Sequence, residues 1–285
     1  MGSDTSEVTL DLFPYLKVYK DGTLERIAGV EVVPGLDLQT NILSKDILIV
    51  PQTSVSARIY LPNFVIKDQK IPFVMYFHGG AFCVASPAFP NYHNSLNKLV
   101  AEANIVALSV SYRLVPEHSL PTAYQDSWPA LQWVASHEEE DGHHHEGWIK
   151  DYVDLDQVFL VSDSAGANIA HHLSLRSRNR IWISGGKGCD DPFINPFVDG
   201  SPDLVGLACH GILVIVAKKD ILRDRGRFYY DKLVKSGWRR KAEILQNEGE
   251  DHVFHIFNPN CDKAKSLMKC LATFLNQGLG KGIVE

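Results

Sequence analysis

Short apolar runs, almost free of polar residues, recur along the chain and constrain its fold more than any other feature. Strands buried on both faces produce such runs, and here every run after the first is followed by a stretch with helical periodicity. The runs cover residues 71–77, 105–110, 158–161, 211–217 and 242–246, and the later helical stretches cover 121–137, 167–177, 225–236 and 263–276. This alternation predicts an α/β fold with a mostly parallel sheet flanked by helices. No linker divides the chain, so residues 1–285 are expected to form a single domain.

Two further elements are expected before the first buried run. Residues 17–24 contain an Asp21-Gly22 pair that suits a hairpin, and residues 56–62 have the alternating pattern of a strand. Pro129 lies inside the helical stretch 121–137 and is expected to divide or kink it, because proline cannot donate the intrahelical hydrogen bond.

Composition narrows the possible partners. The net charge is −6 without a basic stripe, which argues against nucleic acid, and no apolar run approaches the ~18 residues of a membrane span. The five cysteines are scattered and no secretory signal is visible, so we expect reduced thiols and a cytoplasmic location. The acidic and histidine-rich stretch 138–146 is interpreted as a solvated loop, and neither a metal nor a cofactor is expected.

The stretch Ser162-Asp163-Ser164-Ala165-Gly166 directly follows an apolar run and directly precedes a helical pattern. A serine on a tight turn between a strand and a helix is typical of a nucleophile, since the amino end of the helix favours negative charge nearby. Taken alone, a serine after a strand is more often structural. The small residues that follow Ser164 favour the catalytic interpretation.

His78-Gly79-Gly80-Ala81 follows the run 71–77, where two glycines leave backbone amides free to face a ligand. Acyl transfer needs such donors for the oxyanion, although an ordinary glycine turn has the same sequence. Asp220 and His252 each follow a later strand. The carboxyl ends of parallel strands meet at one edge of a sheet, and the order Ser164, Asp220, His252 is typical of α/β-hydrolases.

With these motifs, the chain resembles the plant carboxylesterase family of α/β-hydrolases, related to hormone-sensitive lipase. The resemblance rests on the segments LFPYLKVYKDG, YFHGGAF, SYRLVPEHSLPTAYQDSWPALQWV, SDSAGANIAHH, DDPFINP, VAKKDILRDRGRFYY and GEDHVFHIFNP. It implies Ser164 as nucleophile, His252 as general base and Asp220 as the residue that orients the base. It also implies an oxyanion hole formed by the amides of Gly79, Gly80 and Ala165. Residues 1–30 would form an N-terminal lid, and residues 181–205 would be a remnant of the cap.

The sequence departs from this family in two places. Ser162 stands where the G-x-S-x-G pattern has its first glycine, and the connection from Ser164 to Asp220 is too short for the strand and cap helices that the family has there. A sheet without one internal strand would expose apolar faces. The chain is therefore either a natural deletion form or a sequence from which residues have been left out. We favour the second explanation, because a sheet cut in the middle should not fold.

Three functions are compatible with the resemblance. The first is hydrolysis of an ester of a small, acylated metabolite of plant specialised metabolism through an acyl-enzyme. The second is a non-hydrolytic dehydratase or cyclase that uses the same pocket. The third is a ligand-binding protein similar to the gibberellin receptors, which His252 argues against because those receptors lack this histidine. An intact triad tilts the choice toward hydrolysis, by a monomer or a homodimer.

Overall fold

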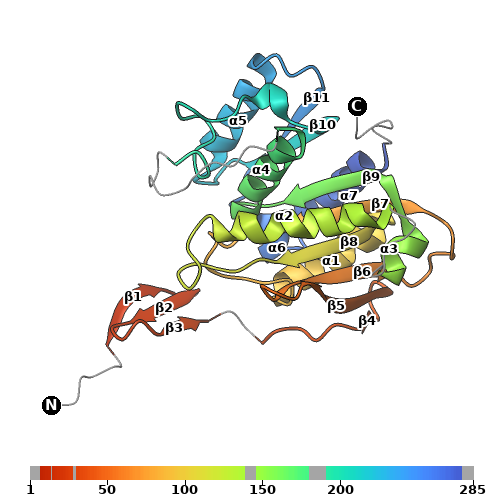
Figure 1. Cartoon of the computed structure of the whole chain (residues 1–285), viewed down its shortest axis with the longest axis horizontal. Helices are drawn as coiled ribbons and strands as arrows, with labels where there is room; N and C mark the ends of the chain where they lie inside the picture. Colours follow the sequence, from red (N-terminus) through yellow and green to blue (C-terminus); the bar gives the residue numbers. More distant parts are fainter. Residues whose placement is uncertain (1–6, 14, 28–29, 139–145, 180–190, 278–285) are drawn as a thin grey trace.

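In the computed structural model of the protein, residues 7–13, 15–27, 30–138, 146–179 and 191–277 are described (Figure 1). The main sheet of this part of the chain has six strands in the order β4-β5-β6-β8-β7-β9. Its strands are β4 (Leu36–Asp37), β5 (Ile42–Val50), β6 (Val55–Pro62), β7 (Ile71–Phe77), β8 (Val106–Ser111) and β9 (Val153–Ser162). The neighbours β8, β7 and β9 are parallel, whereas β4, β5, β6 and β8 pair in antiparallel fashion. This arrangement confirms the α/β-hydrolase fold with helices beside the sheet, but the main sheet of the described residues is mixed rather than mostly parallel.

Helices flank the strands of the described part of the chain. They are α1 (Pro90–Ala103), α2 (Thr122–Ala135), α3 (Gly147–Tyr152), α4 (Ala165–Asn179), α5 (Arg223–Lys235), α6 (Phe254–Phe257) and α7 (Asp262–Asn276), with short 3-10 turns at Ser136–Glu138 and Leu204–Gly206. The predicted elements are confirmed, but α1, α3, α6, β4, β5 and the strand Val8–Leu12 were not expected. Pro129 lies inside α2, which continues through it, so the proline does not divide this helix, and a kink at this position stays a prediction. Gly237 follows α5 with φ of 86°, the left-handed conformation that ends many helices.

The continuous apolar runs form the centre of the core. Phe73, Met75 and Phe77 of β7 face one side of the sheet, and Val74 and Tyr76 face the other, all with at most 5% of their surface exposed. Side chains alternate between faces along a strand, so a run without polar residues is required where helices cover both faces. This burial places β7 and its two neighbours in the middle of the molecule, with their carboxyl ends at the same edge.

The sheet is interrupted after β9. The last two strands, β10 (Gly211–Ala217) and β11 (Lys241–Asn247), pair in parallel as a separate two-stranded sheet. Within the described residues, no strand pairs with the outer edge of β9 or with the outer edge of β10. The sequence runs without a break through this region, so the deletion belongs to the chain itself. Our explanation by residues left out was therefore wrong.

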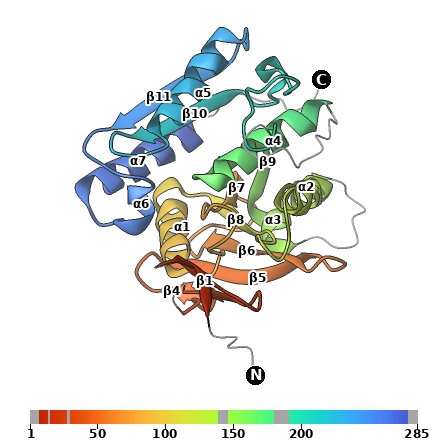
Figure 2. The same ribbon diagram turned by 90° about the vertical axis from the view of Figure 1, so that its left-hand side faces the viewer.

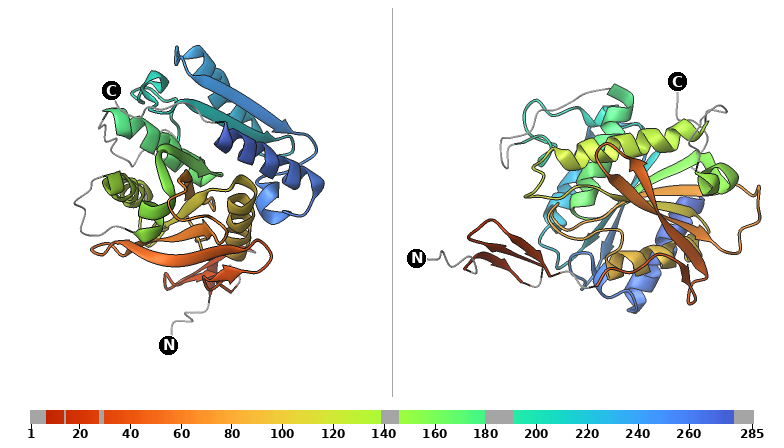
Figure 3. Two further views of the ribbon diagram at one scale, coloured as in Figure 1. Left: turned by 90° about the vertical axis from the view of Figure 1, so that its right-hand side faces the viewer. Right: turned by 60° about the horizontal axis from the view of Figure 1, so that its bottom comes forward.

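Two helices join the separated sheets, which explains how the chain holds together without the missing strand (Figures 2 and 3). On one face, residues of α7 pack against β9 and α1 and also against β10 and β11. On the other face, α4 buries Ile169 and Leu173 against the main sheet. Its Leu175 packs with Leu233 of α5. Each sheet thus keeps an apolar core of its own, and the two cores share α4 and α7.

The N-terminal residues form a small antiparallel sheet that projects from the body (Figure 1). It consists of β1 (Val8–Leu12), β2 (Leu16–Tyr19) and β3 (Leu24–Arg26), which confirms the predicted hairpin. Arg26 joins this sheet to the body, because its guanidinium donates to the carbonyl oxygens of Cys83 and Val115 and pairs with Glu117. That this segment acts as a lid stays a prediction. The predicted cap remnant lies partly outside the described residues, and residues 191–205 of it form turns.

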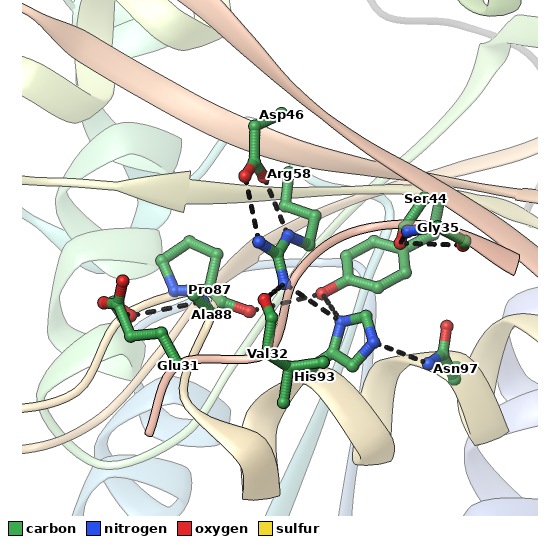
Figure 4. A network of polar contacts seen from close by, with 12 residues as sticks. Glu31, Val32, Gly35, Ser44, Asp46, Arg58, Pro87, Ala88, His93 and Asn97 are labelled. Carbon is green, nitrogen blue, oxygen red and sulfur yellow. Dashed lines mark hydrogen bonds and ion pairs between the residues drawn. The ribbon is translucent and has the colours of Figure 1, made fainter. Parts of the chain in front are cut away.

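The buried Arg58 binds the segment around Val32, which leads from the N-terminal sheet into the core (Figure 4). The Arg58 side chain is 2% exposed and forms two hydrogen bonds with Asp46, at 2.7 and 2.9 Å. Its third nitrogen donates to the carbonyl oxygen of Val32 and lies 3.3 Å from Nδ1 of His93. Burial and the nearby Arg58 charge lower the pKa of His93 to about 4, so the ring is neutral near pH 7. The charged partner of the Arg58 guanidinium is therefore Asp46.

Candidate active site

The turn between β9 and α4 has the geometry of a nucleophile elbow. β9 ends at Ser162, α4 begins at Ala165, and Ser164 between them has φ of 49°. A non-glycine residue in the left-handed region stores strain and is typical of the elbow serine. Gly166 lies against the end of β7, where a Cβ atom would come within 2.0 Å of the carbonyl oxygen of Phe77. Any larger residue would push α4 away from the sheet and displace Ser164 with it.

Ser162, the residue that replaces the usual glycine, pairs with Phe77 across the β7–β9 ladder and is only partly buried. Within the described residues, β9 has no strand on its other side. A side chain at this position therefore meets less crowding than it would between two strands. The deletion and the serine are thus compatible with each other, and the elbow forms despite the departure from G-x-S-x-G.

We expect that Ser162→Gly preserves or raises the melting temperature and changes kcat by less than about tenfold. Serine adds only a hydroxymethyl group to a turn that already accommodates it, at a cost of about 1–2 kcal/mol at most. Thermal unfolding and ester turnover of the variant beside the wild type would measure both effects. A gain of several hundredfold in turnover would contradict this expectation and would mean that Ser162 suppresses hydrolysis.

Three predicted residues meet at the carboxyl edge of the strands. Oγ of Ser164 lies 2.9 Å from Nε2 of His252, and Nδ1 of the same ring lies 2.8 Å from Oδ2 of Asp220. A carboxylate only accepts hydrogen bonds, so Nδ1 carries the proton of the neutral ring and Nε2 accepts from the serine hydroxyl. The contacts join residues from the ends of β9, β10 and β11 across the interrupted sheet.

Backbone hydrogen bonds between the turns after β10 and β11 hold the acid and the histidine in place. The Lys218 amide donates to the Asn247 carbonyl at 3.0 Å, and the Lys219 amide donates to the Glu250 carbonyl at 2.8 Å. Oδ1 of Asp220 accepts from the Leu222 amide at 2.7 Å, which leaves Oδ2 for the imidazole. Asp224 instead pairs with Arg223 at the surface, as expected for a residue in the first turn of α5.

The structure does not support all of the predicted oxyanion hole. The Gly79 amide donates to Oη of Tyr92 and to Oδ1 of Asp163, both at 3.1 Å, so it faces away from a substrate at Ser164. Among the described residues, no acceptor is recorded for the amides of Gly80, Ala81 or Ala165. Gly80 has φ of 100°, which lets the loop fold back so that Cys83 and Val84 donate to its carbonyl oxygen.

Sequence reasoning missed the buried polar residues behind the elbow. Asp163 accepts hydrogen bonds from the hydroxyl groups of Tyr76 and Tyr92, at 2.7 and 2.8 Å. Burial raises the pKa of Asp163, and the hydrogen bonds from the two tyrosines and the Gly79 amide oppose this shift. The only available signal was Asp163 itself, an acidic residue beside the serine. Tyr76 gave no signal, because it lies in a run that is otherwise apolar.

The described residues contain neither a candidate metal cluster nor a candidate membrane span. They contain no cluster of three or more metal-ligating side chains and no helix that is long and apolar enough to cross a membrane. Most of the histidine-rich loop, residues 139–145, lies outside the described part. His255 is partly buried near the triad, and desolvation lowers its pKa to about 4. Cys83, Cys209, Cys261 and Cys270 are free thiols, as predicted, whereas Cys189 lies outside the described residues.

Comparison with known proteins agrees with this fold. A family described by the alpha/beta hydrolase fold matches the chain in two segments, residues 74–187 and 179–256. Probable carboxylesterase 2 of Arabidopsis thaliana is 48% identical over 318 residues, which cover 97% of this chain and 99% of the relative. That alignment is longer than the chain of 285 residues, so the relative carries residues without a counterpart here.

A second relative has a different named activity. The 2-hydroxyisoflavanone dehydratase of Glycyrrhiza echinata is 37% identical over 328 residues, which cover 96% of this chain and 100% of the relative. Among solved structures, the thermostable carboxylesterase EstE1 from a metagenomic library superimposes with a TM-score of 0.66 at 26% identity. This likeness covers 89% of this chain and 92% of that one.

Proposed function

Since the chain belongs to the alpha/beta hydrolase family and is an ester-cleaving enzyme of the carboxylesterase type, we propose that Ser164, His252 and Asp220 are its catalytic triad. The substrate would be an ester of a small, acylated plant metabolite. The observation that carries this proposal is the pair of hydrogen bonds that His252 makes, one to Asp220 and one to the Ser164 hydroxyl. In this arrangement the histidine can take the serine proton as the oxygen attacks a carbonyl.

The proposed reaction proceeds in two steps. Ser164 Oγ bonds to the ester carbonyl carbon while its proton moves to Nε2 of His252, and Asp220 stabilises the imidazolium. The carbon–oxygen bond to the alcohol then breaks, and the departing alkoxide takes the proton from His252. Water attacks the acyl-enzyme by the same route, with His252 as base, and releases the acid and the free serine.

The oxyanion of each tetrahedral intermediate needs backbone donors that are not already used. We assign this role to the amides of Gly80, Ala81 and Ala165 in place of the set Gly79, Gly80 and Ala165, because the Gly79 amide is bonded to Tyr92 and Asp163. Ala165 is the first residue of α4, so its amide also lies at the positive end of the helix dipole.

A second candidate is an elimination or cyclisation performed in the same pocket. The similarity to the 2-hydroxyisoflavanone dehydratase over nearly the full chain favours keeping it. Against it stands this pair of hydrogen bonds from His252 to Asp220 and Ser164, since a serine aligned with a base is what acyl transfer requires. A receptor without turnover is the weakest of the three, because His252 is present and hydrogen-bonded on both nitrogens.

A screen of acetylated plant metabolites distinguishes the first two candidates. The purified protein would be incubated with each compound, and free acetate would be measured beside any elimination product. We expect acetate and the deacetylated alcohol in equal amounts. Elimination without release of the intact alcohol would contradict the proposed hydrolysis and favour the second candidate. The cytoplasmic location and the monomeric or dimeric state stay proposals, which imaging of a fluorescent fusion and light scattering would test.

A further inference from the structure

We propose that Asp163 is a positioning residue for catalysis, which fixes the oxyanion loop against the nucleophile elbow. The inference rests on the proposed hydrolase function. Asp163 lies between Ser162 and Ser164, and its carboxylate is buried behind the elbow. It belongs to the elbow by its backbone and to the loop after β7 by its hydrogen bonds, so it couples the two parts that must act on one carbonyl group.

The contacts of the carboxylate are directed at one glycine and two tyrosines. Oδ1 accepts from the Gly79 amide at 3.1 Å and from the Tyr76 hydroxyl at 2.7 Å, and Oδ2 accepts from the Tyr92 hydroxyl at 2.8 Å. Tyr92 also accepts from the Gly79 amide at 3.1 Å. The Gly79 amide is thus held by two acceptors, the Asp163 carboxyl group and the Tyr92 hydroxyl.

The carboxylate also explains why residue 79 is glycine. A Cβ atom at Gly79 would lie 2.3 Å from Oδ2 of Asp163 and 3.0 Å from Cβ of Ser164. The space that a side chain would need is occupied by the carboxylate and the elbow. Glycine at position 79 therefore leaves space for the Asp163 carboxylate. Its amide is bonded to the carboxylate, and its α-carbon lies close to the elbow.

The hold on Gly79 determines where the next amide points. On its carbonyl side, the oxygen of Gly79 lies 2.8 Å from Nδ1 of His78, and the Tyr112 hydroxyl donates to the neighbouring carbonyl oxygen of His78 at 2.7 Å. The carbonyl and the following N–H belong to one planar trans peptide and point in opposite directions. With the Gly79 amide and carbonyl both fixed, the Gly80 N–H has one available direction. Removal of the Asp163 acceptor weakens the hold on the Gly79 amide, and the direction of the Gly80 N–H is then less restricted.

The test is Asp163→Asn, which keeps the volume but replaces one carboxylate oxygen by a donor facing other donors. We expect kcat/KM for an ester to fall about 10- to 100-fold with KM changed less than threefold, because loss of an oxyanion donor costs about 10²–10³. A trifluoromethyl ketone, which forms a tetrahedral adduct with the serine, should lose affinity by a similar factor. A purely structural role would lower the melting temperature without this parallel loss.

Two tyrosine variants complete the design. Tyr92→Phe removes a hydroxyl that contacts both Gly79 and Asp163, and we expect it to lower kcat and ketone affinity about fivefold even if Asp163→Asn does not fold. Tyr76→Phe leaves the Gly79 contacts intact and should change both less than threefold. Suppose that the wild type hydrolyses esters and that folded Asp163→Asn keeps wild-type kcat and ketone affinity. The inference is then wrong and the proposed function stands. If Asp163→Asn does not fold, the same result for Tyr92→Phe leads to the same conclusion. A wild type without ester turnover refutes the proposed function instead.

Discussion

Ser164→Ala is expected to reduce kcat for ester hydrolysis by about 10³–10⁶ while the protein stays folded. The alanine lacks the oxygen that attacks the carbonyl, and the described residues place no other hydroxyl group in contact with Nε2 of His252. The left-handed backbone at residue 164 is no worse for alanine than for serine, so the fold should persist. Residual activity would come from the oxyanion amides and from substrate binding alone.

Covalent labelling gives this prediction a second, independent measurement. An organophosphate should add to Ser164 of the wild type, visible as a peptide mass shift, and Ser164→Ala should remain unlabelled. Ser162→Ala is the matched control, since it removes a hydroxyl two residues away and should keep both labelling and turnover within about tenfold. Hydrolysis by Ser164→Ala at the wild-type rate would refute the proposed mechanism.

The central strands could be predicted because burial on both faces leaves a simple signature. The run 71–77 coincides with β7, and 211–217 coincides with β10. Helix α1 was missed since its buried face includes polar side chains, among them His93, Ser95 and Asn97, that interrupt the apolar pattern. The strand β5 was also missed, although buried and more exposed residues alternate along it, as expected for a strand at the antiparallel side of the sheet.

The interruption of the sheet shows where sequence reasoning reached its limit. The absence of one strand could be inferred from the short connection between Ser164 and Asp220. Its consequence could not, because survival of the fold depends on the helices α4 and α7, each of which packs against both sheets. The local periodicity of a helix shows that one face is buried, but it does not show that this helix packs against two cores.

The site was predictable to the extent that strand ends determine it. Ser164, Asp220 and His252 each follow a parallel strand, so their meeting follows from topology. The direction of single amides does not, since it depends on side-chain contacts from distant elements. The Gly79 amide was expected to face the substrate, but Tyr92 of α1 and Asp163 of the elbow accept its hydrogen bond. Neither acceptor could be identified from the glycine motif alone.

Asp220→Asn is expected to reduce kcat by about 10⁴ with little change in melting temperature, by analogy with the loss of the same role in serine proteases. The oxygen of the introduced side-chain amide can still accept from the Leu222 amide, as Oδ1 of Asp220 does now, which turns the side-chain nitrogen toward His252. That nitrogen cannot accept the proton of Nδ1. The imidazole then carries its proton on Nε2, facing Ser164, and can no longer act as a base.

Asp224→Asn is the matched control, because it makes the same chemical change four residues away. The Asp224 side chain is 79% exposed and pairs with Arg223, so a surface ion pair worth at most about 1 kcal/mol is lost. We expect kcat within about threefold of the wild type. Single-turnover rates with a chromogenic ester, measured for both variants beside the wild type, would test the pair. If Asp224→Asn proved the more damaging change, the orienting acid would be Asp224, and the contact between Asp220 and His252 would not serve catalysis.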